Sequence, residues 1–237
     1  MTDPRHGLPD SAPGVLLAAR DLHKAYGPTL ALAGADFSIR AGEVVAVMGP
    51  SGSGKSTLLH CLAGIVTPDS GSISYQGREL ATMNDVGRSR LRRHDFGFVF
   101  QFGQLVPELT CVQNVALPLR LNGAGRKGAE ERALAWMRRL EVDDLARRRP
   151  GEVSGGQGQR VAVARSLVTG PRVLFADEPT GALDSHNGER VMQLLTEAAR
   201  STDAAVVLVT HEPRVAAYAD RQLVVLDGTS RAVEQAV

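Results

Sequence analysis

The stretch that most constrains this chain is GPSGSGKST, at residues 49–57. It follows an apolar run, residues 44–48, that has the character of a buried parallel strand. Residues 57–63 then read as the first turns of a helix packed on that strand. Glycines at this spacing let successive backbone N–H groups converge on one anion, and the helix start adds its positive dipole end. The stretch therefore predicts a strand, a phosphate-binding loop and a helix, in that order.

The ligand that this loop predicts is a nucleoside triphosphate with Mg²⁺. Lys55 is expected to neutralise its β and γ phosphates, and the Ser56 hydroxyl to bind the metal ion. The remaining residues of the predicted phosphate loop are Gly49, Pro50, Ser51, Gly52, Ser53, Gly54 and Thr57. The alternative is a Gly/Ser-rich loop with a chance lysine, which the strand before it and the helix after it argue against.

The bulk properties suit one α/β domain, or a core with one inserted subdomain, because 237 residues with 43% hydrophobic content can fill such a core. A net charge of +1 gives no reason to expect nucleic acid as a partner. No apolar run reaches the roughly 18 residues that a membrane-spanning helix needs. Residues 1–14 are expected to form a mobile tail without the apolar core of a signal peptide, so we expect a cytoplasmic protein.

The region before the phosphate loop predicts strands over residues 15–20 and 35–39, with a turn at residues 26–29 between them. Tyr26 is thereby placed on a loop, where it is either a surface tyrosine or an aromatic that stacks on a base. A short strand over residues 72–75 completes a small antiparallel region. The basic run at residues 88–94 favours a solvated helical face over a nucleic-acid patch, because no aromatics interleave with it.

Residues 97–101 read as an apolar strand that ends in Gln101, whose amide can be directed into a site. The loop that follows contains Phe102, Leu105, Val106 and Leu109, interrupted by glycine and proline. We expect a partner to cover these apolar residues; the alternative is that they pack on the chain's own helices. Residues 112–121 and 129–140 read as those helices, in an insertion between two halves of the core.

A second candidate anion site lies at residues 154–157. Ser154 is a plausible N-cap, and its hydroxyl acts together with the amides of Gly155 and Gly156 and with Gln157 at the start of an apolar-periodic helix. An ordinary serine-capped helix start looks similar, so this site depends on its context.

Two carboxylates follow the buried strand predicted for residues 173–177. Asp177 suits a role in holding Mg²⁺, and Glu178 suits a role in polarising the water that attacks the γ-phosphate. The alternative is a solvated acidic pair at a strand end. His211 follows another predicted strand, at residues 205–209, and is placed to contact the γ-phosphate; a purely structural histidine is its alternative.

The order of these motifs resembles that of ATP-binding cassette ATPases over about residues 15–230. The motifs are the phosphate loop, Gln101, residues 154–157, Asp177 with Glu178, Asp184 and His211. Residues 97–101, 179–185 and 219–221 are similar to the macrolide-exporter and lipoprotein-release group. The resemblance implies an α/β P-loop NTPase core of mainly parallel strands in a domain over residues 15–237. An N-terminal antiparallel β region and an inserted helical subdomain, at about residues 102–165, would complete it.

The resemblance also implies roles for single residues. Tyr26 would stack on the adenine of ATP, and Gln101 would contact Mg²⁺ and link its site to a membrane partner. Two copies would sandwich two ATP molecules head to tail, so that Ser154, Gly155 and Gly156 of one copy cover the γ-phosphate held by Lys55 of the other. Asp184 would lie at the seam between the copies.

The function implied is an ATPase subunit that dimerises on ATP and powers a separate membrane permease. Such a subunit would sit on the inner face of the cell membrane and drive export of lipid, lipoprotein or antimicrobial compounds. The alternative is an ATPase that drives a membrane regulator of cell-wall enzymes or signalling. Soluble relatives that act on DNA or ribosomes carry a second cassette or a long coiled coil, and this sequence has neither.

Four positions depart from the pattern that the resemblance sets: Val153, Gly158, Gln113 and Ala182. None of them removes a phosphate-binding, metal-binding or water-activating group. Gly158 is expected to loosen its helix by up to about 1 kcal/mol. Gln113 stands where a glutamate is usual, which changes the charge expected at a partner surface.

Overall fold

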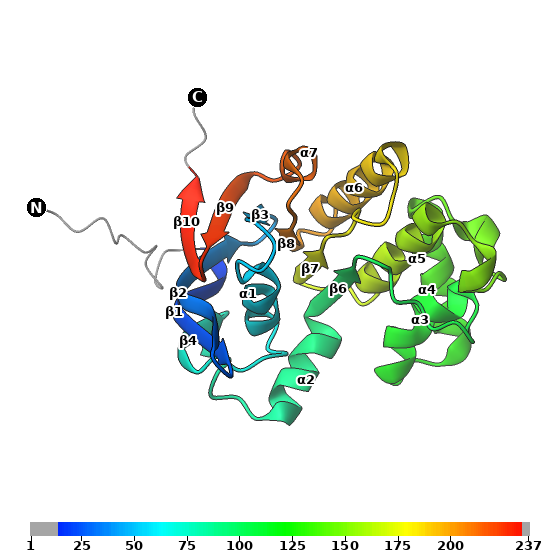
Figure 1. The fold of residues 1–237 in the computed structure, drawn as a ribbon. Coiled ribbons are helices and arrows are strands. Elements are labelled where there is room, and N and C mark those ends of the chain that lie inside the picture. Colours follow the sequence, from blue (N-terminus) through cyan, green and yellow to red (C-terminus); the bar gives the residue numbers. More distant parts are fainter. Residues whose placement is uncertain (1–13, 234–237) are drawn as a thin grey trace, which may run out of the picture.

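Two β-sheets organise the computed structural model, which describes residues 14–233 (Figure 1). The first sheet is antiparallel, with strand order β2-β1-β4-β5. Its strands are β1 (Val15–Tyr26), β2 (Thr29–Arg40), β4 (Ser70–Tyr75) and β5 (Arg78–Glu79). The second sheet has the order β10-β9-β3-β8-β7-β6 and is parallel except for β10. Its strands are β3 (Val44–Met48), β6 (Phe96–Phe100), β7 (Val173–Asp177), β8 (Ala205–Val209), β9 (Arg221–Leu226) and β10 (Thr229–Val233).

Helices cover the parallel sheet and form a separate bundle beside it (Figure 1). The helices are α1 (Lys55–Leu62), α2 (Asp85–His94), α3 (Cys111–Leu121), α4 (Arg126–Arg139), α5 (Gly155–Leu167), α6 (Ser185–Arg200) and α7 (Pro213–Ala216). Short 3₁₀ turns lie at Asp143–Leu145 and Pro150–Glu152. Helices α3, α4 and α5 pack on one another and form the green part of the ribbon.

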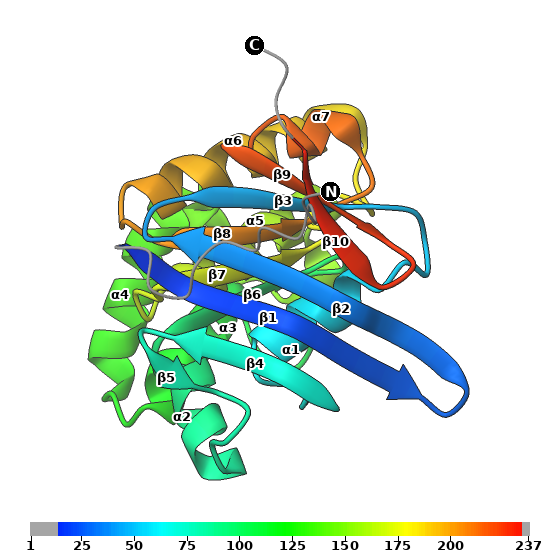
Figure 2. The same ribbon diagram turned by 90° about the vertical axis from the view of Figure 1, so that its left-hand side faces the viewer.

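The parallel sheet separates two apolar cores. Alternate residues of β8 show the division, because Val206 and Leu208 belong to the core shared with α3, α4, α5 and α6. Val207 and Val209 belong to the other core, which α1 and the antiparallel sheet complete. Figure 2 shows this antiparallel layer facing the viewer. A strand covered on both faces is apolar throughout, which explains the uninterrupted apolar runs in the sequence.

The predicted elements occur: strands β3, β7 and β8 have the predicted bounds, β6 lies one residue earlier than predicted, and β1, β2 and β4 are longer. Strands β1 and β2 extend to Tyr26 and Thr29, so Tyr26 ends a strand and its assignment to a loop was wrong. Helix α4 begins at Arg126, three residues before the predicted start at residue 129. Helix α2 buries none of its residues, as expected for a solvated basic helix. The tail predicted at residues 1–14 lies outside the described residues except for Gly14.

Edge strand β6 meets helix α5 so closely that Gly97 has no room for a side chain. A Cβ atom there would lie 2.4 Å from the carbonyl oxygen of Ser166 and 3.0 Å from Cδ1 of Leu174. We expect Gly97→Ala to lower the free energy of unfolding by about 1–3 kcal/mol, because the core must move apart to accept the methyl group. Urea titration followed by circular dichroism measures this change.

Gly128→Ala is the matched control for that measurement. Gly128 lies in α4, and no atom of the described residues lies within 4 Å of the position of its added Cβ. The control is expected to keep or raise the free energy of unfolding, by up to about 1 kcal/mol. Equal effects of the two substitutions would contradict the close contact between β6 and α5.

Candidate active site

The phosphate loop, residues 49–57, is held between strands of both sheets. Gly49 has a φ of 147° and Gly54 a φ of 104°, in the region that L-residues rarely adopt. A Cβ at Gly49 would lie 2.2 Å from the carbonyl oxygen of Val225, and one at Gly54 would lie 2.2 Å from that of Ala31. Only glycine fits at these two positions, both for conformation and for space.

Lys55 begins helix α1, and its side chain folds back over the loop. Its ammonium Nζ donates hydrogen bonds to the carbonyl oxygens of Gly49, at 2.9 Å, and Pro50, at 2.8 Å. The loop lines a pocket of about 590 Å³, here called the loop pocket. The lining residues are Thr29, Ala31, Pro50, Ser51, Gly52, Gly54, Lys55, Ser56, Thr57, Glu178 and His211. This volume suits a small-molecule ligand.

Oxygen donors for a metal ion lie beside this lysine. The Ser56 hydroxyl oxygen is 3.5 Å from Oδ1 of Asp177, at the end of strand β7. Burial raises the pKa of Asp177, and the Ser56 hydroxyl and other neighbours only partly oppose this shift. A hydroxyl and an under-solvated carboxylate are ligands that Mg²⁺ accepts. The Ser53 hydroxyl oxygen is also buried, and among residues 14–233 it has no hydrogen-bond partner, so it is free to bind a ligand.

Glu178 has a strained backbone, with a φ of 45°. Its N–H donates to the carbonyl oxygen of Val209 at 2.9 Å, which holds the turn against strand β8. One carboxylate oxygen, Oε1, lies 2.8 Å from Nδ1 of His211, which follows the same strand. Non-glycine residues in this conformation cluster at functional sites. The structure therefore brings Glu178, His211 and the phosphate loop to one pocket, and Asp177 lies beside it at the Ser56 hydroxyl.

Gln101 approaches the same carboxylate across Gly181. A Cβ at Gly181 would lie 2.7 Å from Nε2 of Gln101 and 3.2 Å from Oε2 of Glu178. The loop after Gln101 is tied to helix α5, because Gln159 donates to the carbonyl oxygen of Phe100 at 2.9 Å. Arg165 donates to the carbonyl oxygens of Gly103 and Gln104 at 2.6 and 2.8 Å.

The residues that make these hydrogen bonds were not singled out in the sequence. Gln159 is almost fully buried, and burial lowers the pKa of Arg165. Asn114 is fully buried and binds backbone groups of Val106, Leu109 and Thr110. In the sequence, each of them is only a polar residue on the apolar face of a helix. That pattern does not identify the group that the residue binds.

Ser154 and Asp184 each cap a helix. Ser154 accepts from the N–H of Gln157 at 3.3 Å, and the Gln157 side chain accepts from the N–H of Ser154 at 2.9 Å, so the predicted N-cap is confirmed. Asp184 caps α6 by accepting from the N–H of Asn187. Among the described residues that line the loop pocket, none comes from residues 154–157.

The family model described as ABC transporter matches residues 32–181. The chain belongs to this family.

Relatives and solved structures agree with the family model. The lipoprotein-releasing system ATP-binding protein LolD of Cytophaga hutchinsonii is 44% identical over 213 residues, covering 90% of this chain and 97% of that protein. LolD of Hydrogenovibrio crunogenus is 43% identical over 218 residues, covering 90% of this chain and 95% of that protein. A dimeric, post-hydrolysis structure of the ATP-binding cassette MJ0796, bound to ADP and Pi, matches with a TM-score of 0.86. It is 35% identical and covers 94% of this chain and all of that one.

The predicted family, α/β fold and ATPase activity are thereby confirmed. This ABC ATPase has the antiparallel β region and the mainly parallel core that the resemblance implied. Among the residues that the structure describes, no helix is long and apolar enough to cross a membrane.

The adenine contact predicted for this ABC ATPase involves the end of the β1–β2 hairpin. Tyr26 is 49% exposed and pairs in register with Thr29, which lines the loop pocket together with Ala31. Lys24 places its ammonium 5.7 Å from the centre of the Tyr26 ring. The sequence did not single out Thr29 or Ala31, whose small side chains give no chemical signal.

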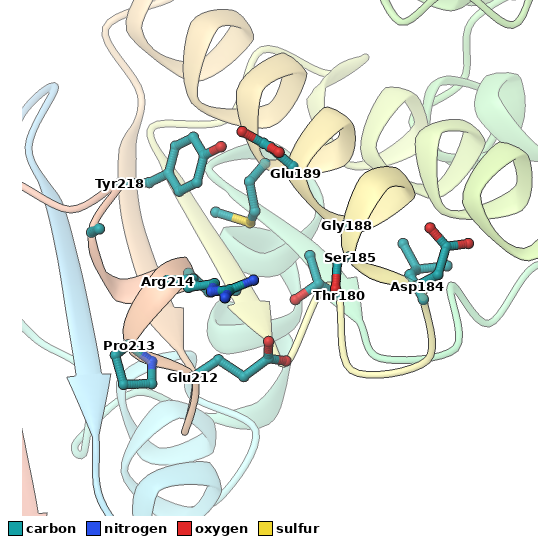
Figure 3. A pocket seen from close by; sticks show the side chains of 13 residues that line it. Thr180, Asp184, Ser185, Gly188, Glu189, Glu212, Pro213, Arg214 and Tyr218 are labelled. Carbon is teal, nitrogen blue, oxygen red and sulfur yellow. The ribbon is translucent and has the colours of Figure 1, made fainter.

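A second pocket, of about 690 Å³, lies between the start of α6 and α7. In Figure 3, Thr180 and Asp184 lie on one side of it, and Glu212, Pro213 and Arg214 on another. It contains none of the phosphate-loop residues, so it is separate from the loop pocket. Thr180 and Asp184 nevertheless belong to the segment that joins Glu178 to α6.

We predict that Lys55→Ala removes ATP binding, because the triphosphate loses the cation held over the loop. Glu178→Gln is expected to keep ATP binding and to lower turnover by about 10²-fold to 10⁴-fold, the range for a lost general base. Calorimetry with ATP and a phosphate-release assay measure the two properties.

Glu189→Gln is the control for the loss of a carboxylate, since Glu189 is exposed on α6 and lines only the second pocket. It should turn over ATP like the unmodified chain. Turnover by Glu178→Gln within about threefold of the unmodified chain would remove Glu178 from its role, given the size expected for a general base.

Proposed function

We propose that this ABC ATPase is the ATP-hydrolysing subunit of a lipoprotein-releasing system and acts on a separate membrane permease. The convergence of Lys55, Ser56, Glu178 and His211 on one pocket, with Asp177 beside Ser56, carries the ATPase part of this proposal. The lipoprotein part rests on relatives of that name, which are 42–44% identical over nearly their whole length. Those relatives favour release over the alternative of a membrane regulator. The permease would hold the subunit at the inner face of the cell membrane.

Within the pocket, each residue takes a separate role. Lys55 and the N–H groups of the phosphate loop bind the β and γ phosphates, where the helix start also attracts anions. Ser56 and Asp177 hold Mg²⁺ together with Gln101, and the ion, when bound, offsets the negative charge of the phosphates. Glu178 accepts the proton of the attacking water. His211, at hydrogen-bond distance from Glu178, orients that carboxylate and contacts the γ-phosphate.

A second copy of the chain completes the site. The N–H groups at the start of α5 are a ready anion site, and in one chain they lie outside the loop pocket. In a two-fold symmetric dimer, Ser154, Gly155 and Gly156 of each copy cover the γ-phosphate at the other copy's Lys55. The solved structures of the cassette MJ0796 are dimeric, which supports a second copy as partner.

We expect Glu178→Gln to become a dimer when Mg-ATP is added, because the γ-phosphate joins the two halves of each site and is not hydrolysed. Light scattering should give twice the monomer mass with ATP and the monomer mass with ADP. Ser154→Arg should abolish both the dimer and turnover, because its long side chain fills the space of the γ-phosphate.

A Glu178→Gln protein that stays monomeric with saturating Mg-ATP, both alone and in complex with its permease, would contradict the shared site. Unchanged turnover in Ser154→Arg would contradict it equally. Gly151→Ala is the control, because an added Cβ there meets no atom of the described residues within 4 Å.

Of the four apolar residues in the loop after Gln101, Phe102 is exposed, whereas Leu105, Val106 and Leu109 are partly buried. Phe102 is 76% exposed, the largest exposed fraction among the large apolar residues described. Leu105 is partly buried and packs on the core formed with the helices, so the expectation that a partner alone covers it was wrong. The reason is that Asn114 draws this loop onto α3 by binding the backbone of Val106. We therefore assign the permease contact to Phe102.

We predict that Phe102→Asp keeps the basal ATPase activity of the isolated subunit but loses binding to the permease, because a charge replaces an exposed aromatic anchor. Phe102→Leu should keep binding. Leu105→Asp should instead lower the free energy of unfolding, by about 1–3 kcal/mol, because its carboxylate meets apolar neighbours. Co-purification and urea titration separate these outcomes, and full permease binding by Phe102→Asp would refute the assignment.

A further inference from the structure

The side chain of Asn187, rather than an unusual backbone conformation, leaves no room for a Cβ at Gly156. It lies in the first turn of α5 and is buried, and its φ is not in the left-handed region. A Cβ at this position would lie 2.9 Å from Oδ1, 3.0 Å from Cγ and 3.1 Å from Cβ of Asn187. Helix α5 therefore rests its first turn directly on the side chain of Asn187.

Asn187 is itself fixed by Asp184, the residue that caps α6. Its backbone N–H donates to Oδ1 of Asp184 at 2.9 Å, and its side-chain Nδ2 donates to Oδ2 at 2.7 Å. These two hydrogen bonds are the main reason that the pKa of Asp184 lies below its usual range. The Nδ2 end of the Asn187 amide is thereby held by Asp184, and its Oδ1 end lies against Gly156.

We propose that Asn187 is a positioning residue that sets the place of the Ser154 motif, residues 154–157, relative to the Asp184 loop. The inference rests on the proposed shared site, because the Ser154 motif works only when it reaches the other copy's γ-phosphate. Neither the motifs in the sequence nor the family resemblance assigned Asn187 a role.

Further contacts join helices α5 and α6 near the one between Gly156 and Asn187. Cδ2 of Leu183 lies 3.4 Å from the position of a Cβ at Gly155. About one turn later on each helix, Glu141 pairs with both Arg160 of α5 and Arg190 of α6. Since these contacts follow one another along the helices, the first turns of α5 and α6 form one unit. Leu183 and Asn187 are the members closest to the phosphate-binding end of α5.

The same turn of α6 also touches the chain's own catalytic segment. Gly188, next to Asn187, is buried against Thr180, whose Cβ would lie 3.4 Å from a Cβ added at Gly188. Thr180 is two residues after Glu178, and Figure 3 shows it beside the start of α6. The first turn of α6 therefore lies between the carboxylate that acts at the chain's own ATP and the motif that acts at the partner's ATP.

The test compares Asn187→Ala with His186→Ala, both in the Glu178→Gln background. His186 is exposed in the same turn of α6, and no side-chain hydrogen bond of His186 is recorded among the described residues. Analytical ultracentrifugation gives the protein concentration at which half of each variant is dimeric in Mg-ATP. We expect Asn187→Ala to raise the dimer dissociation constant about tenfold to 100-fold, because the loss of a hydrogen-bonded contact counts twice in a symmetric dimer.

Three further readouts separate positioning from a general structural role. ADP binding by the monomer and the melting temperature should match those of His186→Ala, since the loop pocket and the core are untouched. In the Glu178 background, Asn187→Ala should lower kcat more than it changes KM for ATP. Asn187→Ser, whose hydroxyl can still donate to Asp184, should recover part of the dimer.

The outcomes distinguish this inference from the proposal on which it rests. If the parent Glu178→Gln does not dimerise in Mg-ATP, the shared site itself fails. If the parent dimerises and Asn187→Ala dimerises equally well, the shared site stands and the role of Asn187 is refuted. A loss of ADP binding or a large fall in melting temperature would likewise refute positioning, because it would show that Asn187 supports the fold.

Discussion

The nucleotide site depends on how closely the phosphate loop approaches strands of both sheets. The carbonyl oxygen of Val225, in the parallel sheet, and that of Ala31, in the antiparallel sheet, leave no space for a Cβ at Gly49 and Gly54. Because the loop is held from both sides, its N–H groups can face the pocket without being drawn into either sheet. The antiparallel layer is therefore part of the binding site and more than a cover for α1.

The two proposed anion sites of the chain lie at the starts of two different helices. Lys55 and the start of α1 face the loop pocket, whereas Ser154 and the start of α5 belong to the helical bundle. Each uses N–H groups that a helix leaves without intrahelical partners. A triphosphate in the loop pocket of one chain leaves the Ser154 site of that chain unused. This separation is the physical reason to expect a second copy.

The sequence predicted the parts of the structure that depend on neighbours in the chain. The phosphate loop, the acidic pair after β7 and the N-cap at Ser154 each need only a few consecutive residues. The sequence did not predict contacts between residues that are far apart in the chain. Nothing near Leu105 shows that Asn114 draws its loop onto α3, and nothing near Gly156 shows that Asn187 occupies the space of its missing side chain. From the sequence alone, Gly156 is a motif glycine, and only the structure shows that Asn187 lies against it.

Helix α5 connects the exposed surface at Phe102 to the anion site at Ser154. Gln159 and Arg165, on α5, bind backbone groups on both sides of Phe102, while Ser154 caps the same helix. A helix moves as a rigid element, so a displacement of Phe102 that these hydrogen bonds transmit also displaces the Ser154 motif. Lys55 lies on α1, outside the bundle, and need not follow. A partner that pulls on Phe102 would therefore change how the second copy covers the γ-phosphate, while Lys55 keeps its place over the phosphate loop.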